Sequence, residues 1–98
     1  MARQSVARSV TLNNATAALV VGPSPKRVAV LFVPGNAGRY TIGTENTVTL
    51  DSGPTLQTGG PTIEITLEKH GEIVQRAWYG FGAAAGATYA GVIETFDE

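Results

Sequence analysis

The sequence predicts an all-β fold, a compact antiparallel β-sandwich or jelly roll of about eight short strands. Short apolar or alternating runs recur along the 98 residues and are separated by turn residues. Twelve glycines and five prolines suit such short strands and tight turns. No segment carries the 3.6-residue apolar period of an amphipathic helix. The length suits one domain, residues 1–98, with a single core.

Lys26–Pro34, with the sequence KRVAVLFVP, is the segment around which we expect the other strands to be organised. Its run Val28–Val33 is unbroken in apolar residues and is too short for a buried helix. A half-exposed strand would alternate apolar and polar residues, so we expect both faces of this strand to be covered. The segment therefore predicts the central strand of a two-layer β domain.

Seven further strands are expected at regular spacing. They are Ser5–Leu12, Thr16–Val21, Arg39–Gly43, Asn46–Asp51, Thr62–Glu68, Ile73–Phe81 and Thr88–Phe96. The first of them is interpreted as an edge strand, because Arg8 on its apolar face discourages further pairing. Ser52–Pro61 is predicted to be irregular, with Leu56 closing the end of the core. Lys69–Glu72 is predicted to be a hairpin turn, and small residues are expected to form loops at 35–38 and 82–86.

The charge pattern separates the two halves of the chain. The net charge of −1 argues against a general nucleic-acid or membrane-surface binder. Residues 1–49 carry five basic residues and one acidic residue, net +4, whereas residues 50–98 carry two basic and seven acidic residues, net −5. The basic arm, residues 1–8, and the acidic tail are either two solvated ends or a contact between neighbouring subunits of a homo-oligomer or symmetric array.

The absence of cysteine excludes a disulfide framework, a thiol nucleophile and a zinc–thiolate site. It favours a protein that is assembled inside the cell, because small secreted domains often need disulfides. Ala15–Gly22 is short and polar-flanked, so we interpret it as a strand and not as the core of a signal peptide. No apolar run approaches the ~20 residues of a membrane span. We therefore expect no membrane association.

The sequence shows no pattern that indicates catalysis. His70 lies between Glu68 and Glu72, but a structural metal needs more ligands than this segment offers, so we interpret His70 as a solvated turn residue. None of the four serines has the setting of a nucleophile elbow. The loop at 35–38 lacks the Gly-Lys-Ser/Thr ending of a phosphate-binding loop. We expect no enzyme activity, no catalytic residues, no metal and no cofactor.

Aromatic residues are concentrated at Arg76–Phe81. Trp78 and Tyr79 are adjacent and should point to opposite faces of a strand, so one of them is expected inside. Trp78 has three interpretations at this point: core packing, a subunit interface and stacking on a ligand. The alternative function is accordingly a carbohydrate-binding β-sandwich module that uses Trp78, Tyr79 or Tyr40.

Five segments occur in an order that resembles a known family. They are the arginine-led strand Arg27–Val33, Tyr40–Gly43, the loop Gly53–Leu56, the Gly/Ala-rich loop Gly82–Ala87 and the final strand Ala90–Glu94. In this order the chain resembles the small β-sandwich accessory proteins of tailed-bacteriophage capsids, the cement, decoration and head-fibre-base proteins. The resemblance spans most of residues 15–95.

The resemblance implies a non-enzymatic virion structural protein on the capsid surface, assembled in the host cytoplasm. Its partners would be the major capsid protein or other virion proteins, with copies related by symmetry. The arm, residues 1–8, is expected to add to the sheet edge of a neighbour. Candidate interface residues are Arg3, Arg8, Arg39, Tyr40, Arg76, Trp78, Asp97 and Glu98.

Overall fold

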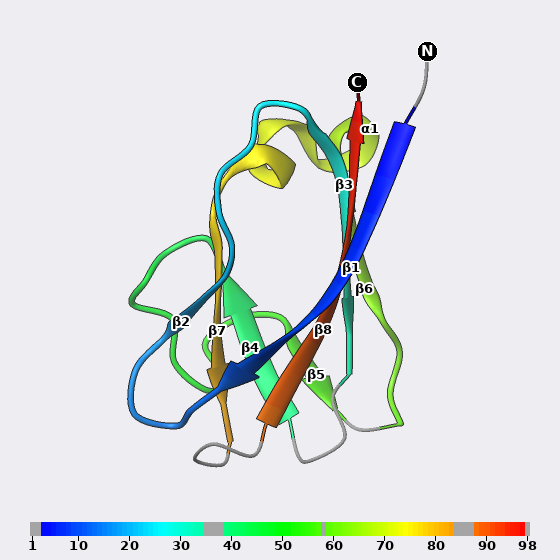
Figure 1. Ribbon diagram of the computed structural model, residues 1–98. Helices are drawn as coiled ribbons and strands as arrows, with labels where there is room; N and C mark the ends of the chain where they lie inside the picture. Colours follow the sequence, from blue (N-terminus) through cyan, green and yellow to red (C-terminus); the bar gives the residue numbers. More distant parts are fainter. Residues whose placement is uncertain (1–2, 35–38, 58, 84–87, 98) are drawn as a thin grey trace.

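Two four-stranded antiparallel sheets pack face to face in the computed structural model, which describes residues 3–34, 39–57, 59–83 and 88–97 (Figure 1). Sheet A contains, in spatial order, β1 (Arg3–Leu12), β8 (Thr88–Asp97), β3 (Arg27–Val33) and β6 (Ile63–Thr66). Sheet B contains β2 (Ala18–Val21), β7 (Trp78–Gly82), β4 (Arg39–Gly43) and β5 (Thr55–Gln57). The predicted all-β sandwich is confirmed.

The strand pairing is that of a long antiparallel hairpin rolled into two sheets. β1 pairs with β8, β2 with β7, β3 with β6 and β4 with β5, and successive pairs lie in opposite sheets. The roll is joined by the antiparallel pairs β3–β8 and β4–β7. Of the two predicted architectures, this is the jelly roll.

Apolar side chains from both sheets form one core between the layers. It consists of Leu12, Val20, Val21, Val30, Phe32, Tyr40, Ile42, Leu56, Ile65, Val74, Trp78, Ala90 and Val92. Phe32 of sheet A and Trp78 of sheet B meet across it, with ring centroids 5.4 Å apart and planes tilted by 54°. Val30 and Phe32 confirm that the predicted central strand contributes to the core, and Leu56 occupies the predicted place in it.

A helical segment connects β6 to β7. It consists of α1 (Leu67–His70) and the 3₁₀ helix η1 (Gly71–Gln75). The strand predicted over Thr62–Glu68 is therefore shorter than expected, and the strand predicted over Ile73–Phe81 begins late. Val74 points from η1 into the core, so this connection fills one end of the sandwich.

Local hydrogen bonds explain why the chain leaves the strand conformation at Thr66. Its Oγ1 accepts the backbone N–H of Lys69 at 3.2 Å, and Nδ1 of His70 accepts the N–H of Thr66 at 3.0 Å. Such bonds offer the backbone an alternative to a strand ladder. The predicted hairpin turn at Lys69–Glu72 is therefore wrong, and Leu67, which belongs to the strand predicted over Thr62–Glu68, lies in α1 and is exposed.

The segment Asn46–Asp51 forms turns, and the prediction of a strand there is wrong. Ser52 Oγ donates to the carbonyl of Thr49 at 2.6 Å and accepts the N–H of Thr49 at 3.0 Å. Asp51 has a φ of 64°, a left-handed conformation that interrupts an extended strand. The fourth strand of sheet B is instead Thr55–Gln57, within the segment predicted to be irregular.

The N-terminal segment, expected to add to the sheet of a neighbour, pairs with β8 in sheet A of the same chain. Residues 3–8 form the first part of β1, with Arg3 opposite Asp97 on β8, and the two termini lie at the same end of the molecule (Figure 1). β1 is an edge strand, as predicted. The predicted loop at 35–38 and residues 84–86 of the predicted second loop lie outside the described residues.

Candidate protein-binding face

The eight predicted interface residues do not form one site. Tyr40 and Trp78 are buried in the core, so the prediction that they contact a partner is corrected, and core packing is the interpretation that holds for Trp78. The hydroxyl of Tyr40 donates to the carbonyl of Val33, and burial raises the pKa of Tyr40. Trp78 Nε1 donates to the carbonyl of Ile73 at 3.1 Å. Glu98 lies outside the described residues.

Most of the charged candidates lie on the surface, in ion pairs within the chain. Arg3 Nε is 3.0 Å from Asp97. Arg39 binds Asp51 through Nε and Nη2, at 3.2 and 3.1 Å, and this hydrogen bonding raises the pKa of Arg39. Arg76 is exposed. Exposed pairs of this kind contribute little to stability, and Arg3 and Arg39 lie in different sheets.

A third ion pair, which the sequence did not predict, is buried on the inward face of sheet A. Arg27 and Glu94 are only 2% and 3% exposed. Arg27 Nη2 lies 2.7 Å from Glu94 Oε1, and its Nε donates to the same oxygen at 3.0 Å. The other carboxylate oxygen of Glu94 accepts from Nη2 of the half-exposed Arg8 at 2.9 Å. Arg8 therefore links the buried Arg27–Glu94 pair to the protein surface.

The remaining hydrogen bonds of Arg27 connect it to two further segments. Its Nη1 donates to the carbonyls of Val74 and Arg76, at 3.1 and 3.0 Å, and its Nη2 donates to the carbonyl of Gly22. The guanidinium also lies 5.9 Å from the ring centroid of Phe96. Arg27 thus joins β3, β8, the end of η1 and the segment after β2, which identifies it as a structural residue.

A β-bulge explains why Arg27 points inward. Arg27 is opposite Phe96, whereas Ala29 is opposite Thr95, so Val28 is an extra residue in β3. Without this bulge, Arg27 would share the outer face with Ala29. One signal was present in the sequence, since the alternation of the final strand places Glu94 on the inward face.

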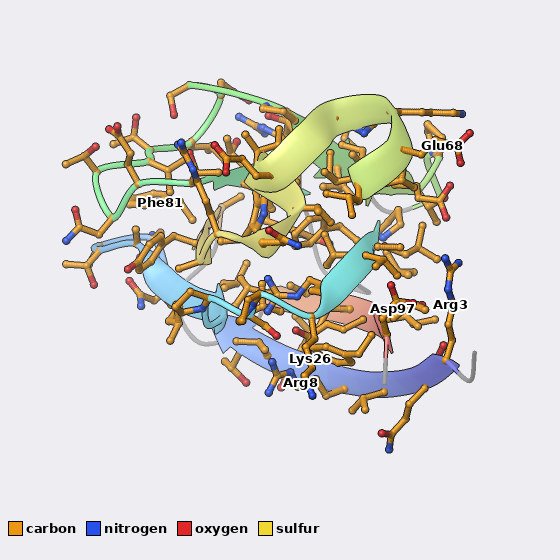
Figure 2. All side chains as sticks on the ribbon, turned by 90° about the horizontal axis from the view of Figure 1, so that it is seen from above. Arg3, Arg8, Lys26, Glu68, Phe81 and Asp97 are labelled. Atoms are coloured by element: carbon orange, nitrogen blue, oxygen red, sulfur yellow. The ribbon has the colours of Figure 1, made fainter. Side chains whose placement is uncertain are left out.

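The outer face of sheet A is the side that points away from sheet B. The register places on the middle of this face Ser5, Ala7 and Ser9 of β1, Gly91, Ile93 and Thr95 of β8, Ala29, Leu31 and Val33 of β3, and Glu64 and Thr66 of β6, with Arg3 and Asp97 beyond them at one end and Thr11 and Tyr89 at the other. We give the name face A to the eleven residues in the middle. In Figures 1 and 2 no described helix or strand packs over them. The described chain itself does not supply the expected cover on the outer face of β3, where Ala29, Leu31 and Val33 stay half-buried.

Face A is apolar in its middle and poor in charge. Leu31 and Ile93 are cross-strand partners at its centre, and Ile93 is 36% exposed. Serine, threonine, alanine and glycine surround them, and Glu64 at the β6 edge is the one charged member of face A. Depletion of charge around exposed apolar residues is typical of the middle of a protein–protein interface.

The outer face of sheet B is partly covered by the chain itself. The segment between β4 and β5 folds back over it, where the N–H of Asp51 donates to Thr41 Oγ1 at 2.8 Å and the N–H of Ile42 donates to the carbonyl of Pro54 at 3.0 Å. Thr41 is fully buried although it points away from the core. Leu19, 52% exposed, remains on the open part of this face.

The described residues show no arrangement that indicates a catalytic or metal site. Within residues 3–34, 39–57, 59–83 and 88–97, no group of three or more His, Cys, Asp or Glu side chains could hold a metal ion. His70 is exposed and accepts a hydrogen bond from the backbone. The prediction that the chain is not an enzyme stays a prediction. Among the described helices, none has the length and apolar character needed to cross a membrane.

Comparison with protein families, with curated proteins and with solved structures finds no match for this chain. The functional argument therefore depends on the geometry of face A and on the charges around it.

Proposed function

We propose that this chain is a non-enzymatic virion structural protein, which binds and stabilises a bacteriophage capsid through protein–protein contacts made by face A. One observation carries the proposal: the central strand β3 directs Ala29, Leu31 and Val33 outward, where the described chain leaves them half-buried. Burial of a leucine side chain is worth roughly 1.5–3 kcal/mol, so contact with another protein would recover free energy that the isolated chain lacks.

The jelly-roll topology is compatible with this role but does not select it. Jelly rolls occur both in viral capsid proteins and in lectins, and fold alone does not define function. The aromatic residues favour the protein-binding role over the carbohydrate-binding one. Of the three aromatics predicted to stack on a sugar, Tyr40 and Trp78 are buried core residues, which leaves the half-buried Tyr79 on sheet B; Tyr89, 40% exposed, lies on the other sheet.

A symmetric shell is the kind of partner that suits a shallow, charge-poor face. Each copy of a small accessory protein can make only a limited contact, but repeated and linked contacts raise the effective affinity without any deep pocket. We therefore propose the major capsid protein, or another virion protein that repeats with the shell, as the partner and the capsid surface as the location.

The test is co-sedimentation of the purified chain with shells assembled from the major capsid protein of the phage that encodes it. We expect the wild-type chain to sediment with the shells. Leu31→Glu should weaken binding at least about tenfold, because it places a charge in the middle of face A. Leu19→Glu on sheet B is the matched control and should bind normally. A folded wild-type chain that stays in the supernatant would contradict the proposal.

A further inference from the structure

β1 presents a long open edge. It has ten residues, whereas the other three edge strands, β2, β5 and β6, have four, three and four. Among the residues that the structure describes, no strand pairs with its other side. We infer that this edge pairs with β1 of a second copy of the chain, antiparallel and about a two-fold axis at Val6. Two four-stranded A sheets then join into one sheet of eight strands, an arrangement that goes beyond the proposed function and leaves face A open.

β1 lacks most of the features that protect an edge strand from further pairing. Such features are a short strand, a bulge, a proline or charged side chains at the edge. β1 pairs with β8 without a register shift from Arg3 to Leu12 and contains no proline. Its two arginines, Arg3 and Arg8, bind carboxylates of β8 at 3.0 and 2.9 Å. Both guanidinium groups are therefore held toward β8 and away from the open edge.

The accessible part of this edge is residues 3–9. All seven are exposed, whereas Val10 is half-buried and Leu12 is buried. The end of the strand turns toward sheet B, where Leu12 packs against Gly80 of β7 (Figure 1). Because Val6 and Arg8 on the inward face are exposed, sheet B does not cover the first part of β1. A second strand can therefore approach along residues 3–9.

Few registers allow β1 to pair with itself. Directly opposed residues of an antiparallel pair lie on the same face of the sheet, so the two-fold axis must pass through a residue and not between two residues. An axis at Val6 pairs residues 3–9 with themselves, which is the segment that is exposed. In this register Val6 faces Val6, Ser5 faces Ala7, Gln4 faces Arg8 and Arg3 faces Ser9.

The position of Arg8 favours an axis at Val6 over the neighbouring ones. An axis at Arg8 would place the two Arg8 side chains directly opposite each other, where like charges are destabilising. An axis at Ala7 would leave them as diagonal neighbours, about 7–8 Å apart. With the axis at Val6 they are four residues apart along the strands, on the order of 14 Å. Each guanidinium then lies opposite the amide of Gln4, whose oxygen can accept a hydrogen bond.

Pairing would also cover an apolar side chain. Val6 is 40% exposed and lies on the inward face, beside a hollow that Lys26 and Phe96 help to line. The axis brings the two Val6 side chains together at the centre of the contact, as a cross-strand pair. The backbone contributes about six to eight hydrogen bonds over residues 3–9. Main-chain hydrogen bonds of this kind supply affinity without a deep pocket.

The joined sheet would present two copies of face A on one side. The axis is perpendicular to the sheet, so the outer faces of both A sheets point in the same direction, and the pairing buries neither of them. That both copies meet the shell together rests on the proposed function. Two linked contacts would then raise the effective affinity of the dimer for the shell.

The first test measures the oligomeric state of the full chain by sedimentation velocity over a range of concentrations. We expect a monomer–dimer equilibrium for the wild type. Val6→Lys should raise the dimer dissociation constant at least about tenfold, because it places two ammonium groups opposite each other at the axis. Leu19→Lys on sheet B is the matched control and should leave it unchanged. A wild-type chain that is monomeric at millimolar concentration, or a dimer that Leu19→Lys weakens equally, would overturn the inference.

The second test identifies the register by disulfide formation, since the chain has no cysteine. Val6→Cys places two thiols at the axis, where the Cα atoms of opposed residues are about 4.5–5.5 Å apart, a distance that a disulfide spans. Mild oxidation should therefore give a covalent dimer. Ser9→Cys is the control, because each thiol then faces Arg3 of the other copy and should not cross-link. A Val6→Cys chain that cross-links no faster than Ser9→Cys would exclude this register.

The dimer and the capsid role can fail separately. A wild-type chain that stays monomeric but sediments with shells would exclude the dimer and keep the proposed function. The covalent Val6→Cys dimer keeps both copies of face A open, so it should sediment with shells as well. A covalent dimer and a wild-type chain that both stay in the supernatant would exclude the capsid role and support the paired edge alone.

Discussion

Arg27 of β3 and Glu94 of β8 form a buried ion pair on the side of sheet A that faces sheet B, with 2.7 Å between Arg27 Nη2 and Glu94 Oε1. Removal of both charges from water is unfavourable, and their attraction compensates only where further hydrogen bonds satisfy the remaining polar atoms. Here the guanidinium also binds three backbone carbonyls, and the carboxylate also binds Arg8. The pair therefore fixes how β3 and β8 meet the segments that close one end of the roll.

Glu94→Gln should destabilise the fold by about 3–5 kcal/mol, because it leaves the positive charge of Arg27 buried without a partner. Urea denaturation measures the change as a shift of the midpoint. Asp97→Asn, which breaks the exposed Arg3–Asp97 pair on the same strand, is the control and should have a much smaller effect. Equal effects of the two substitutions would contradict the structural role of the buried pair.

Gly80→Ala should destabilise the protein by roughly 1–3 kcal/mol through overpacking. A Cβ at this position would lie 3.0 Å from Leu12 Cδ1 and 3.1 Å from Val20 Cγ2, inside the core. Gly22→Ala is the matched control, since a Cβ there meets no atom within 4 Å. Thermal unfolding of the two variants should separate them clearly, and a Gly80→Ala variant as stable as the control would contradict the described packing of β7.

Stability should fall at alkaline pH because of Tyr40. Burial raises its pKa above the ordinary value of 10.0, so below that pH the hydroxyl is protonated in both the folded and the unfolded chain. Above it the unfolded chain loses this proton first, and the free energy of unfolding therefore decreases as the pH rises. Denaturation midpoints between pH 8 and pH 11 measure the decrease. Tyr40→Phe should show a smaller decrease, and identical slopes for both proteins would count against the buried hydroxyl.

Trp78, the single tryptophan, should behave as a core residue. Its fluorescence should resist quenching by iodide in the native protein and become accessible on unfolding. Trp78→Ala should cost about 3–5 kcal/mol in stability, as expected for removal of a large buried aromatic. Strong quenching in the native protein would contradict the buried position of Trp78.

The sequence predicted the strands whose apolar pattern matches their burial. In the central strand, Val30 and Phe32 lie in the core as expected. The helical segment after β6 was not predicted, because Thr66 and His70 satisfy backbone groups through side-chain hydrogen bonds that an apolar period does not reveal. The segment Asn46–Asp51 alternates like a strand, but side-chain hydrogen bonds and the positive φ of Asp51 hold it in turns.

The candidate site was less predictable than the fold. Tyr40 and Trp78 have the chemistry of interface residues, but the jelly roll directs them inward, and only the pairing of β4 with β7 decides this. Face A escaped prediction for the opposite reason. An unbroken apolar run such as Val28–Val33 indicates burial on both sides, and the sequence does not show whether the second cover comes from the same chain or from another one.

The most direct measurement of the central claim is the protection of single thiols. The chain has no cysteine, so Ile93→Cys places one thiol at the centre of face A and Leu19→Cys places one on the outer face of sheet B. Both should react rapidly with a maleimide reagent in the dilute free chain. On assembled shells, the thiol at position 93 should become protected while that at position 19 stays reactive. Unchanged reactivity at position 93 in chains that are bound to shells would contradict the account.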